Sequence, residues 1–372
     1  MRVMQFDVKK TNMVKCIAII LMLIHHLFSC APELCSKYGT ESIIFDWNHI
    51  MQFSSACKVC VGIFVFLTAY GITKAYHAQF SDSRIADGSR IGKFCIKRYI
   101  KLEMNFLFVY VITVLTYFLR QDGNNLWQIY GISGSKKGLL YAAIDMLGCA
   151  HRLSSPTLNP TWWYMSTAIL LVFLIPILVK LYHSFGISII ICCALLFCGK
   201  KYDGVTEYAL CMCMGVFCAE NYIFENMYSK KVIKQNWLNS LLKMFAYALI
   251  AGCLLYVRIK MDMRFFIDAF IPVLCSGFCM ELASICPFSE KAMGFIGSHS
   301  MNMFLIHTLI FLFYFPQYIY KPKNWFAVLL LLTVTSLVVS IIIEKLKEII
   351  GYKKIIDKIC EFNKTTKQDL CC

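Results

Sequence analysis

The chain has 372 residues, of which 59% are hydrophobic and 16% are charged. Soluble domains are about 45–50% apolar and about 25% charged, so this composition excludes a disordered chain, a collagen-like repeat and an ordinary soluble enzyme. Lys and Arg outnumber Asp and Glu by 37 to 22, for a formal net charge of +15. In so apolar a chain, positive charge is typical of the cytoplasmic face of a membrane protein. We therefore predict a multi-pass protein of the lipid bilayer that binds no nucleic acid.

A helix needs about 20 mostly apolar residues to cross a bilayer. Stretches near this length occur at 13–30, 57–76, 104–119, 162–179, 185–199, 206–223, 238–257, 264–283, 300–319 and 325–343. A shorter apolar stretch at 139–150 contains Asp145 and is expected to be a helix at the membrane surface. The sequence thus predicts an all-α, polytopic membrane helix bundle with about 10 transmembrane helices.

The most basic segments are 77–103 and 344–372. The positive-inside rule places both in the cytoplasm, and ten spans then put the N- and C-termini there as well. We expect a transmembrane domain over 1–343 and a basic cytoplasmic tail over 344–372, which reads as an amphipathic helix at the inner leaflet. The tail ends in Cys371 and Cys372, a weak signal for lipidation. Many of the 20 cysteines lie inside apolar runs, where free thiols behave as small hydrophobic groups rather than as a disulfide framework.

The first span carries two ionisable residues, Lys15 and His26, and such residues in hydrocarbon are functional candidates. They are eleven positions apart, about three helical turns, so both face one side with roughly 16 Å between them. No Cys, His or Asp set at zinc-ligand spacing accompanies His25 and His26, so we predict no metal and interpret His26 as a general base. The plainer readings are a histidine bonded to a neighbouring helix and a lysine that snorkels to the inner membrane edge.

A second group of candidates is Lys97, Arg98 and Lys101, at the cytoplasmic start of the third span. In a helix these three cations form one cluster, because Lys101 follows the other two by four and three positions. Cations oppose the macrodipole at a helix N-terminus, whereas a bound phosphate there is favoured by both the helix and the cations. The cluster therefore predicts a phosphorylated cytosolic ligand; the plainer reading is a positive-inside cluster alone.

Two further segments combine aromatic and polar residues. The fourth span opens with Trp162, Trp163 and Tyr164, which are most simply an interfacial aromatic belt. The ninth span contains Ser300 and His307, which are seven positions apart and share one helical face. The plainer reading of this pair is a polar seam between helices.

Taken together, these segments resemble the acyltransferase 3 family of integral membrane acyltransferases over roughly residues 8–343. Lys15 and His26 stand at the spacing of an Arg–His pair in the family's first span, and Lys97-Arg98-x-x-Lys101 matches its Arg-Arg-x-x-Arg motif. Weaker matches are the segments 64–71, 163–165 and 297–307. Lysine stands where the family has arginine at positions 15, 97 and 101, so charge is kept but bidentate phosphate binding is lost there. Thr68-Ala69 stands where the family has Ser-Gly.

The resemblance implies an O-acetyltransferase-like enzyme that moves an acyl group from cytosolic acetyl-CoA, or another acyl-CoA, to a hydroxyl group. Lys97, Arg98 and Lys101 would hold the phosphates of CoA, and Lys15 would lie near the inner mouth. His26 would deprotonate the acceptor or carry the acyl group itself. Trp163, Ser300 and His307 would contact the substrate, and Ser300 or an indole N–H of Trp162 or Trp163 would orient the acceptor or the oxyanion.

The implied acceptor is a surface glycan or a lipid-linked saccharide of the cell envelope, and the implied location is the bacterial cytoplasmic membrane. The alternative is a proton-coupled transporter that uses His26, although no paired half-repeats of the kind common in transporters are visible. A polytopic scaffold or sensor is a third reading, and it does not require the cluster at Lys97, Arg98 and Lys101.

Overall fold

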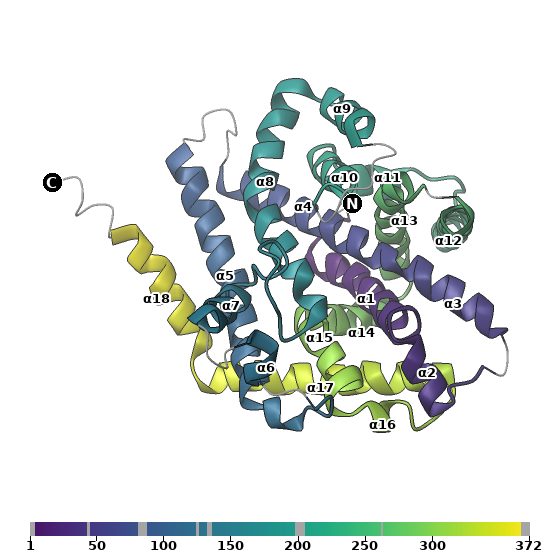
Figure 1. Cartoon of the computed structure of the whole chain (residues 1–372). Helices are drawn as coiled ribbons and strands as arrows, with labels where there is room; N and C mark the ends of the chain where they lie inside the picture. Colours follow the sequence, from purple (N-terminus) through teal and green to yellow (C-terminus); the bar gives the residue numbers. More distant parts are fainter. Residues whose placement is uncertain are drawn as a thin grey trace. The chain divides into compact units, whose positions relative to one another are not determined.

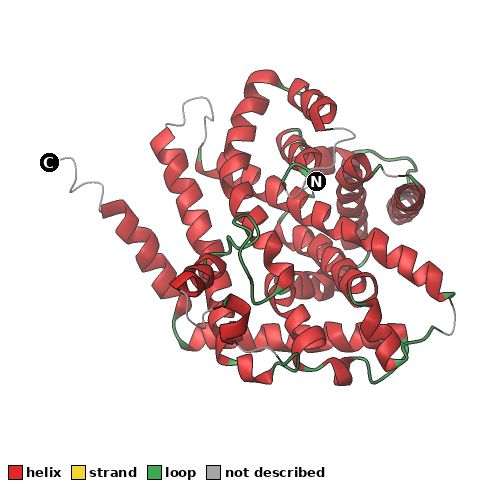
Figure 2. Ribbon diagram, in the orientation of Figure 1, coloured by secondary structure: helices red, strands yellow, loops and turns green. Residues whose placement is uncertain are grey.

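The computed structural model describes residues 4–42, 45–80, 88–123, 126–131, 136–197, 205–261 and 263–365. The secondary structure of this part of the chain consists of helices joined by loops and turns, with no β-strand (Figure 2). Its one bridge of strand type pairs Glu41 with Asn324. The predicted all-α class is therefore confirmed, whereas Cys371 and Cys372 lie outside the described residues.

The chain forms two compact units, and each is considered by itself. Unit 1 comprises Met1–Ile85, Leu174–Met301 and Tyr320–Thr333, and unit 2 comprises Ala86–Phe173, Asn302–Ile319 and Val334–Cys372. Three helices pass from one unit into the other: α8 (Trp163–Phe185), α15 (Ser300–Thr308) and α17 (Trp325–Ile349).

The remaining helices belong to one unit each, and Figure 1 labels most of them. Unit 1 contains α1 (Val8–Ile24), η1 (His25–Cys30), α2 (Pro32–Tyr38), α3 (Trp47–Ala56), η2 (Cys57–Val59), α4 (Cys60–Gln79), α9 (Ser188–Phe197), α10 (Ala209–Glu220), α11 (Ile223–Ser229), α12 (Asn236–Lys260), α13 (Arg264–Ile285) and α14 (Pro287–Ser298). Unit 2 contains α5 (Gly88–Leu115), η3 (Tyr117–Leu119), α6 (Leu126–Tyr130), α7 (Lys136–Met146), η4 (Pro160–Trp162), η5 (Leu309–Tyr314), α16 (Pro316–Ile319) and α18 (Tyr352–Thr365).

Six helical segments in the described residues are long and apolar enough to cross a membrane. They are Val8–Cys30, Trp47–Gln79, Pro160–Phe185, Asn236–Lys260, Arg264–Ile285 and Trp325–Ile349. The pair Pro287–Ser298 and Ser300–Tyr314, bent by 50°, makes a seventh if it is one span. A multi-pass membrane protein is thus confirmed.

By length and composition, the described residues contain fewer transmembrane helices than the about ten expected from the sequence. The other three expected spans coincide with α5, which is long but charged in its first half, and with α9 and α10, which have 10 and 12 residues. Over the described residues, α9 and α10 are shorter than the about 20 residues that a helix needs to cross a bilayer. The stretch expected at the membrane surface corresponds to α7, which is a separate helix of 11 residues.

The boundary expected at residue 343 falls inside α17, which continues to Ile349, and the tail helix α18 then begins at Tyr352. Lys347, one of the basic residues in the tail expected over 344–372, is buried in unit 2. Its Nζ donates to Glu344 Oε1 at 2.6 Å and to Asn302 Oδ1 at 3.3 Å, and also to Asn105. The buried ammonium group is stabilised because carboxylate and amide oxygens accept its hydrogen bonds.

In unit 1, α1 packs closely against α14. A Cβ atom placed on Gly297 of α14 would lie 1.8 Å from the carbonyl oxygen of Asn12, so only glycine allows this approach. Asp7 caps the start of α1, where its carboxylate accepts from the backbone N–H groups of Lys9 and Lys10. Helix packing and capping together fix the segment that carries Lys15 and His26.

Two buried ion pairs join α12 to α13 in unit 1. Lys243 Nζ lies 3.0 Å from Glu281 Oε1, and Arg258 donates two hydrogen bonds to Asp268 at 2.6 and 3.0 Å. Lipid tails are as apolar as leucine, so hydrophobic burial does not drive helix association in a bilayer, whereas polar pairs do. These pairs therefore account for four charged residues in helices that otherwise suit a membrane.

Candidate active site

His26 lies on η1, a π-helical turn that continues α1. Such turns are frequent at functional sites, because the wider coil redirects side chains. The rings of His25 and His26 have centroids 5.4 Å apart, and both side chains are partly exposed rather than packed in the core. An imidazole in this setting is accessible to a substrate, as a general base must be.

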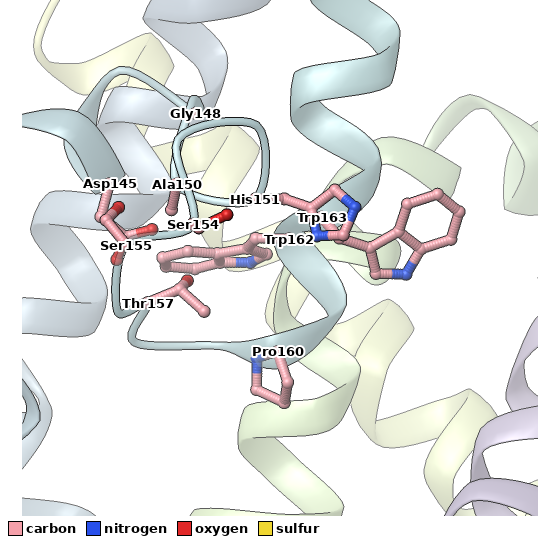
Figure 3. Close-up of a pocket in the computed structure, with 10 residues that line it drawn as sticks. All are labelled: Asp145, Gly148, Ala150, His151, Ser154, Ser155, Thr157, Pro160, Trp162 and Trp163. Atoms are coloured by element: carbon pink, nitrogen blue, oxygen red, sulfur yellow. The ribbon is translucent and has the colours of Figure 1, made fainter. Parts of the chain in front are cut away.

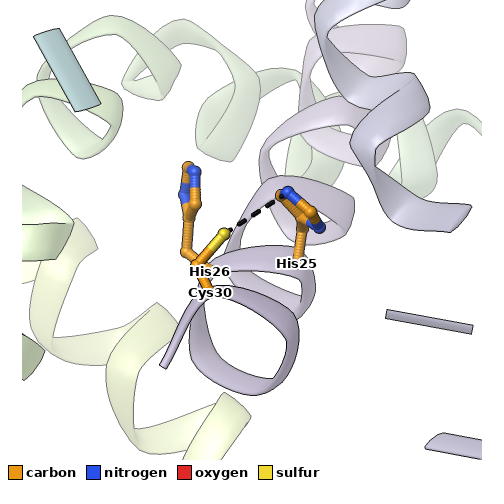
Figure 4. A group of neighbouring side chains, drawn as sticks. All are labelled: His25, His26 and Cys30. Atoms are coloured by element: carbon orange, nitrogen blue, oxygen red, sulfur yellow. Dashed lines mark hydrogen bonds between the residues drawn. The ribbon is translucent and has the colours of Figure 1, made fainter. Parts of the chain in front are cut away.

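Cys30 joins the two histidines and was not expected from the sequence. Its Sγ lies 3.4 Å from His25 Nε2, and Figure 4 shows the sulfur between the two rings. On the other side of the ring, His25 Nδ1 lies 2.9 Å from the carbonyl oxygen of Ser54. The ligand atoms of His25, His26 and Cys30 all lie within 4.8 Å of one another, so this group has the spacing to hold a metal ion. In the sequence, the pattern His-His-x-x-x-Cys at residues 25–30 is the signal that could have indicated this group.

Lys15 lies two turns into α1 and is partly buried. Its Nζ donates a hydrogen bond to Asn12 Oδ1 at 3.2 Å. Asn12 is also the residue whose carbonyl oxygen approaches Gly297. The ammonium group is therefore held toward the start of α1, whereas His26 stands beyond its end.

Lys97, Arg98 and Lys101 lie on α5, with Lys97 and Lys101 exposed. The guanidinium of Arg98 lies over the ring of Phe94, 4.7 Å from its centroid. In the described residues α5 is already helical at Gly88, nine residues before Lys97. The macrodipole acts within the first turn, so the expectation of a helix N-terminus at this cluster is wrong and its attraction for anions rests on the cations alone.

A cavity of about 240 Å³ opens in unit 2, where the loop after α7 leads into η4 and α8. Figure 3 shows the loop wrapped around the Trp162 indole, with Asp145, Ser155 and Thr157 on one side and His151 and Trp163 on the other. The full lining is Asp145, Gly148, Ala150, His151, Ser154, Ser155, Thr157, Pro160, Trp162 and Trp163. Aromatic rings beside hydroxyl, imidazole and carboxyl groups suit a small polar ligand with one apolar face.

Asp145 organises the inner wall of this cavity. Its Oδ2 accepts from the Tyr130 hydroxyl at 2.6 Å and from the backbone N–H of Leu158 at 2.8 Å. Burial raises the pKa of the Asp145 carboxyl, and these hydrogen bonds oppose the rise. The same network continues from Tyr130 to the Tyr110 hydroxyl, 3.1 Å away. Asp145, the acidic residue that argued against a span at 139–150, thus anchors the loop after α7 through its hydrogen bond with Leu158.

His307 is fully buried in unit 2, and both ring nitrogens have partners. Nδ1 lies 2.8 Å from the Phe304 carbonyl oxygen, and Nε2 lies 3.0 Å from Thr308 Oγ1, which in turn lies 3.1 Å from Thr161 Oγ1. The Trp162 indole N–H donates to the Leu305 carbonyl oxygen at 2.9 Å. Because this N–H already donates to Leu305, it does not orient the acyl acceptor or the oxyanion, as was expected of Trp162 or Trp163.

The expected site residues fall into two groups, each described within its own unit. Unit 1 holds Lys15, His26 and the buried Ser300, and unit 2 holds Lys97, Arg98, Lys101, Trp163 and His307. Within unit 2, Trp163 belongs to the cavity, and His307 belongs to the hydrogen-bond network behind it.

Sequence reasoning missed Glu103, two positions after Lys101. Its carboxylate is buried, and neither oxygen accepts a hydrogen bond in the part of the chain that the structure describes. In the sequence, the position of Glu103 directly before the apolar run at 104–119 is the signal that could have indicated a buried acid. A buried carboxylate without a hydrogen bond is costly, which makes Glu103 a further functional candidate.

The acyltransferase 3 family model, described as an acyltransferase domain, matches residues 10–345. No curated protein and no solved structure matches the chain. The match covers the helix that carries Lys15 and His26, the basic cluster on α5 and the cavity of unit 2. With its apolar helices, the chain thus belongs to the acyltransferase 3 family and is a multi-pass membrane acyltransferase.

Proposed function

We propose that this protein transfers an acyl group, in particular acetyl, from cytosolic acyl-CoA to a hydroxyl group of a surface glycan or lipid-linked saccharide. In this proposal it resides in a bacterial cytoplasmic membrane with both termini in the cytoplasm. The observation that carries the proposal is a partly exposed histidine on a π-helical turn, in a chain of this family, at eleven positions from a lysine on the same membrane helix.

His26 acts as the general base. Its imidazole takes the proton of the acceptor hydroxyl as the oxygen attacks the thioester carbonyl. The tetrahedral intermediate then expels the CoA thiolate, which recovers a proton, and the new ester leaves with the acceptor. The neutral imidazole is the form that accepts a proton in this step. Transfer through an acyl-histidine is the second route, in which His26 attacks the thioester itself.

The donor is held by its phosphates. Lys97 and Lys101 are exposed and separated by one helical turn, and Arg98 lies on the same turn. Two lysines in place of arginines act as point charges rather than as bidentate forks, so we expect the cluster to bind phosphate by charge and with little geometric selectivity.

The cavity of unit 2 offers a subsite for one sugar ring of the saccharide. A volume of about 240 Å³ is below the ~300–1,000 Å³ of sites for drug-sized ligands, and it suits one small polar ring. The exposed part of Trp163 supplies an apolar face for a sugar, and Ser154, Ser155 and Thr157 supply hydroxyl groups. His307 acts behind the cavity by holding Thr308 and Thr161, so we assign it a positioning role.

The donor assignment is tested with the variant Lys97→Gln/Arg98→Gln/Lys101→Gln in proteoliposomes. Removing three charges is expected to raise the KM for acyl-CoA by ~10-fold or more, because each charge-assisted hydrogen bond contributes about 1.5–3 kcal/mol, while kcat changes less. The matched control is Lys93→Gln, which removes one exposed charge one turn earlier on α5.

An unchanged KM in the triple variant would contradict the donor site. A wild-type protein that moves a solute with a proton gradient and transfers no acyl group would instead support the transporter alternative.

A further inference from the structure

A second group of metal-ligand residues lies in unit 1, away from η1. His77 Nε2 lies 2.7 Å from Glu220 Oε1, and His183 Nε2 lies 3.2 Å from the same oxygen. The two imidazole rings have centroids 5.6 Å apart, and the ligand atoms of all three side chains lie within 4.8 Å of one another. One carboxylate oxygen therefore gathers two histidines that are 106 positions apart in the sequence.

We propose that His77, His183 and Glu220 form a binding site for a divalent transition-metal ion. Zn²⁺ is a suitable probe ion for this site. Zinc binds imidazole nitrogen at about 2.0–2.1 Å and carboxylate oxygen at about 2.0–2.2 Å in tetrahedral sites. Ligand atoms in such a site are about 3.3 Å apart by tetrahedral geometry. The observed distances of 2.7 and 3.2 Å to Glu220 need only small side-chain adjustments to reach it.

The three ligands lie at the same end of their helices, which favours a cation. His77 and His183 are in the last turns of α4 and α8, and Glu220 is the last residue of α10. A helix C-terminus carries roughly −0.5 elementary charge. The partial negative charge of these last turns and the carboxylate of Glu220 therefore both favour a cation at this position.

Packing between α4 and α10 holds the site together before an ion binds. A Cβ atom on Gly215 of α10 would lie 2.6 Å from the Phe66 carbonyl oxygen and 2.7 Å from Ala69 Cβ on α4. The side chain of Asn221 donates to the Tyr182 hydroxyl at 2.8 Å, which links the ends of α10 and α8. Binding therefore requires little ordering of the chain.

Exposure and charge indicate how the ion is coordinated. The side chains of His77 and His183 are 33% and 29% exposed and that of Glu220 is 12% exposed, so water reaches the site and completes the coordination. Two histidines and one carboxylate with open positions suit Zn²⁺ and other first-row divalent ions. Lys74 faces Glu220 from α4, but its ammonium lies over the ring of Tyr222, 3.8 Å from the centroid.

The experiment measures Zn²⁺ binding to the purified full-length protein by competition with a fluorescent chelator. We expect each of the variants His77→Gln, His183→Gln and Glu220→Gln to bind one Zn²⁺ ion fewer than wild type, or to bind that ion at least ~100-fold more weakly. Loss of an outer hydrogen-bond partner of a ligand already lowers metal affinity by about 10- to 100-fold, and loss of a ligand itself should lower it at least as much. Each variant keeps a side chain of similar size. The matched control is His49→Gln, an exposed histidine of α3 in the same unit, and it should bind as wild type does.

Cobalt separates this site from His25, His26 and Cys30. A Co²⁺ ion at the proposed site gives ligand-field bands without a thiolate charge-transfer band, and Glu220→Gln removes those bands. Glu220→His, which offers a third imidazole, should retain them. Equal Zn²⁺ binding by wild type and the three Gln variants would overturn the proposal. So would a Co²⁺ spectrum in which every band affected by Glu220→Gln carries thiolate character.

Discussion

At the scale of single residues, Asp145 shows how a buried carboxyl group shapes the candidate acceptor cavity. It accepts hydrogen bonds from Tyr130 and Leu158 while burial raises its pKa. A raised pKa in the folded state means that the folded protein holds a proton that the unfolded chain releases as pH rises from about 4. The contribution of Asp145 to stability therefore falls with rising pH in this window.

The variant Asp145→Asn removes this titration and keeps an oxygen that accepts from Tyr130 and Leu158. We expect the Tm of the variant minus the Tm of wild type to increase between pH 4 and pH 7, measured by thermal unfolding in detergent. Asp357→Asn, an exposed position of α18, is the control. A difference that is constant or that decreases with pH would show that the folded state does not raise the pKa of Asp145.

At the scale of helices, the contact between α1 and α14 sets the position of Lys15 and His26. Gly297→Ala would bring a Cβ atom to 1.8 Å from the Asn12 carbonyl oxygen, so the helices must move apart. Overpacking of this kind costs about 1–3 kcal/mol, and we expect a lower Tm together with reduced acyl transfer.

Gly294→Ala is the matched control on the same helix. Its Cβ atom would lie 3.8 Å from the Lys9 carbonyl oxygen, which is an ordinary van der Waals contact. If Gly294→Ala and Gly297→Ala change Tm equally, the close approach of α1 and α14 is not what limits stability.

The helices also show what hydropathy predicts and where it fails. The spans expected at 13–30, 238–257 and 264–283 coincide with long apolar helices, because a continuous apolar run is enough to define them. In the described residues, the runs at 185–199 and 206–223 lie mainly on α9 and α10, which are shorter than a transmembrane helix. Composition records that a segment is apolar, but it does not record where the helix ends.

At the scale of the whole molecule, the sequence predicted the class of protein and its family through the spacing of Lys15 and His26 and through the cluster on α5. It did not predict groups assembled from distant positions. His77, His183 and Glu220 come from three helices, and Asp145 meets Tyr130 and Leu158 across a loop. Such groups depend on tertiary packing, which leaves no local pattern of spacing.

The distribution of exposed residues agrees with a bilayer environment. Only 11% of the residues in the apolar stretch of α12 are buried. The exposed residues of this helix include Leu241, Phe245 and Leu249. Large exposed apolar side chains at these positions are suited to contact with lipid, while Lys243 and Arg258 on the same helix are paired with acids of α13.

His26 is proposed to transfer a proton or an acyl group during acyl transfer from acyl-CoA. The most direct measurement gives radiolabelled acetyl-CoA to proteoliposomes that contain lipid-linked saccharides and follows the label from CoA into the saccharide fraction. Wild type and the control His49→Gln should transfer label at similar rates, and His26→Gln should be slower by about 10²–10⁴-fold, the usual contribution of a general base. A His26→Gln protein that inserts normally and transfers label at the wild-type rate would show that His26 takes no part in the transfer.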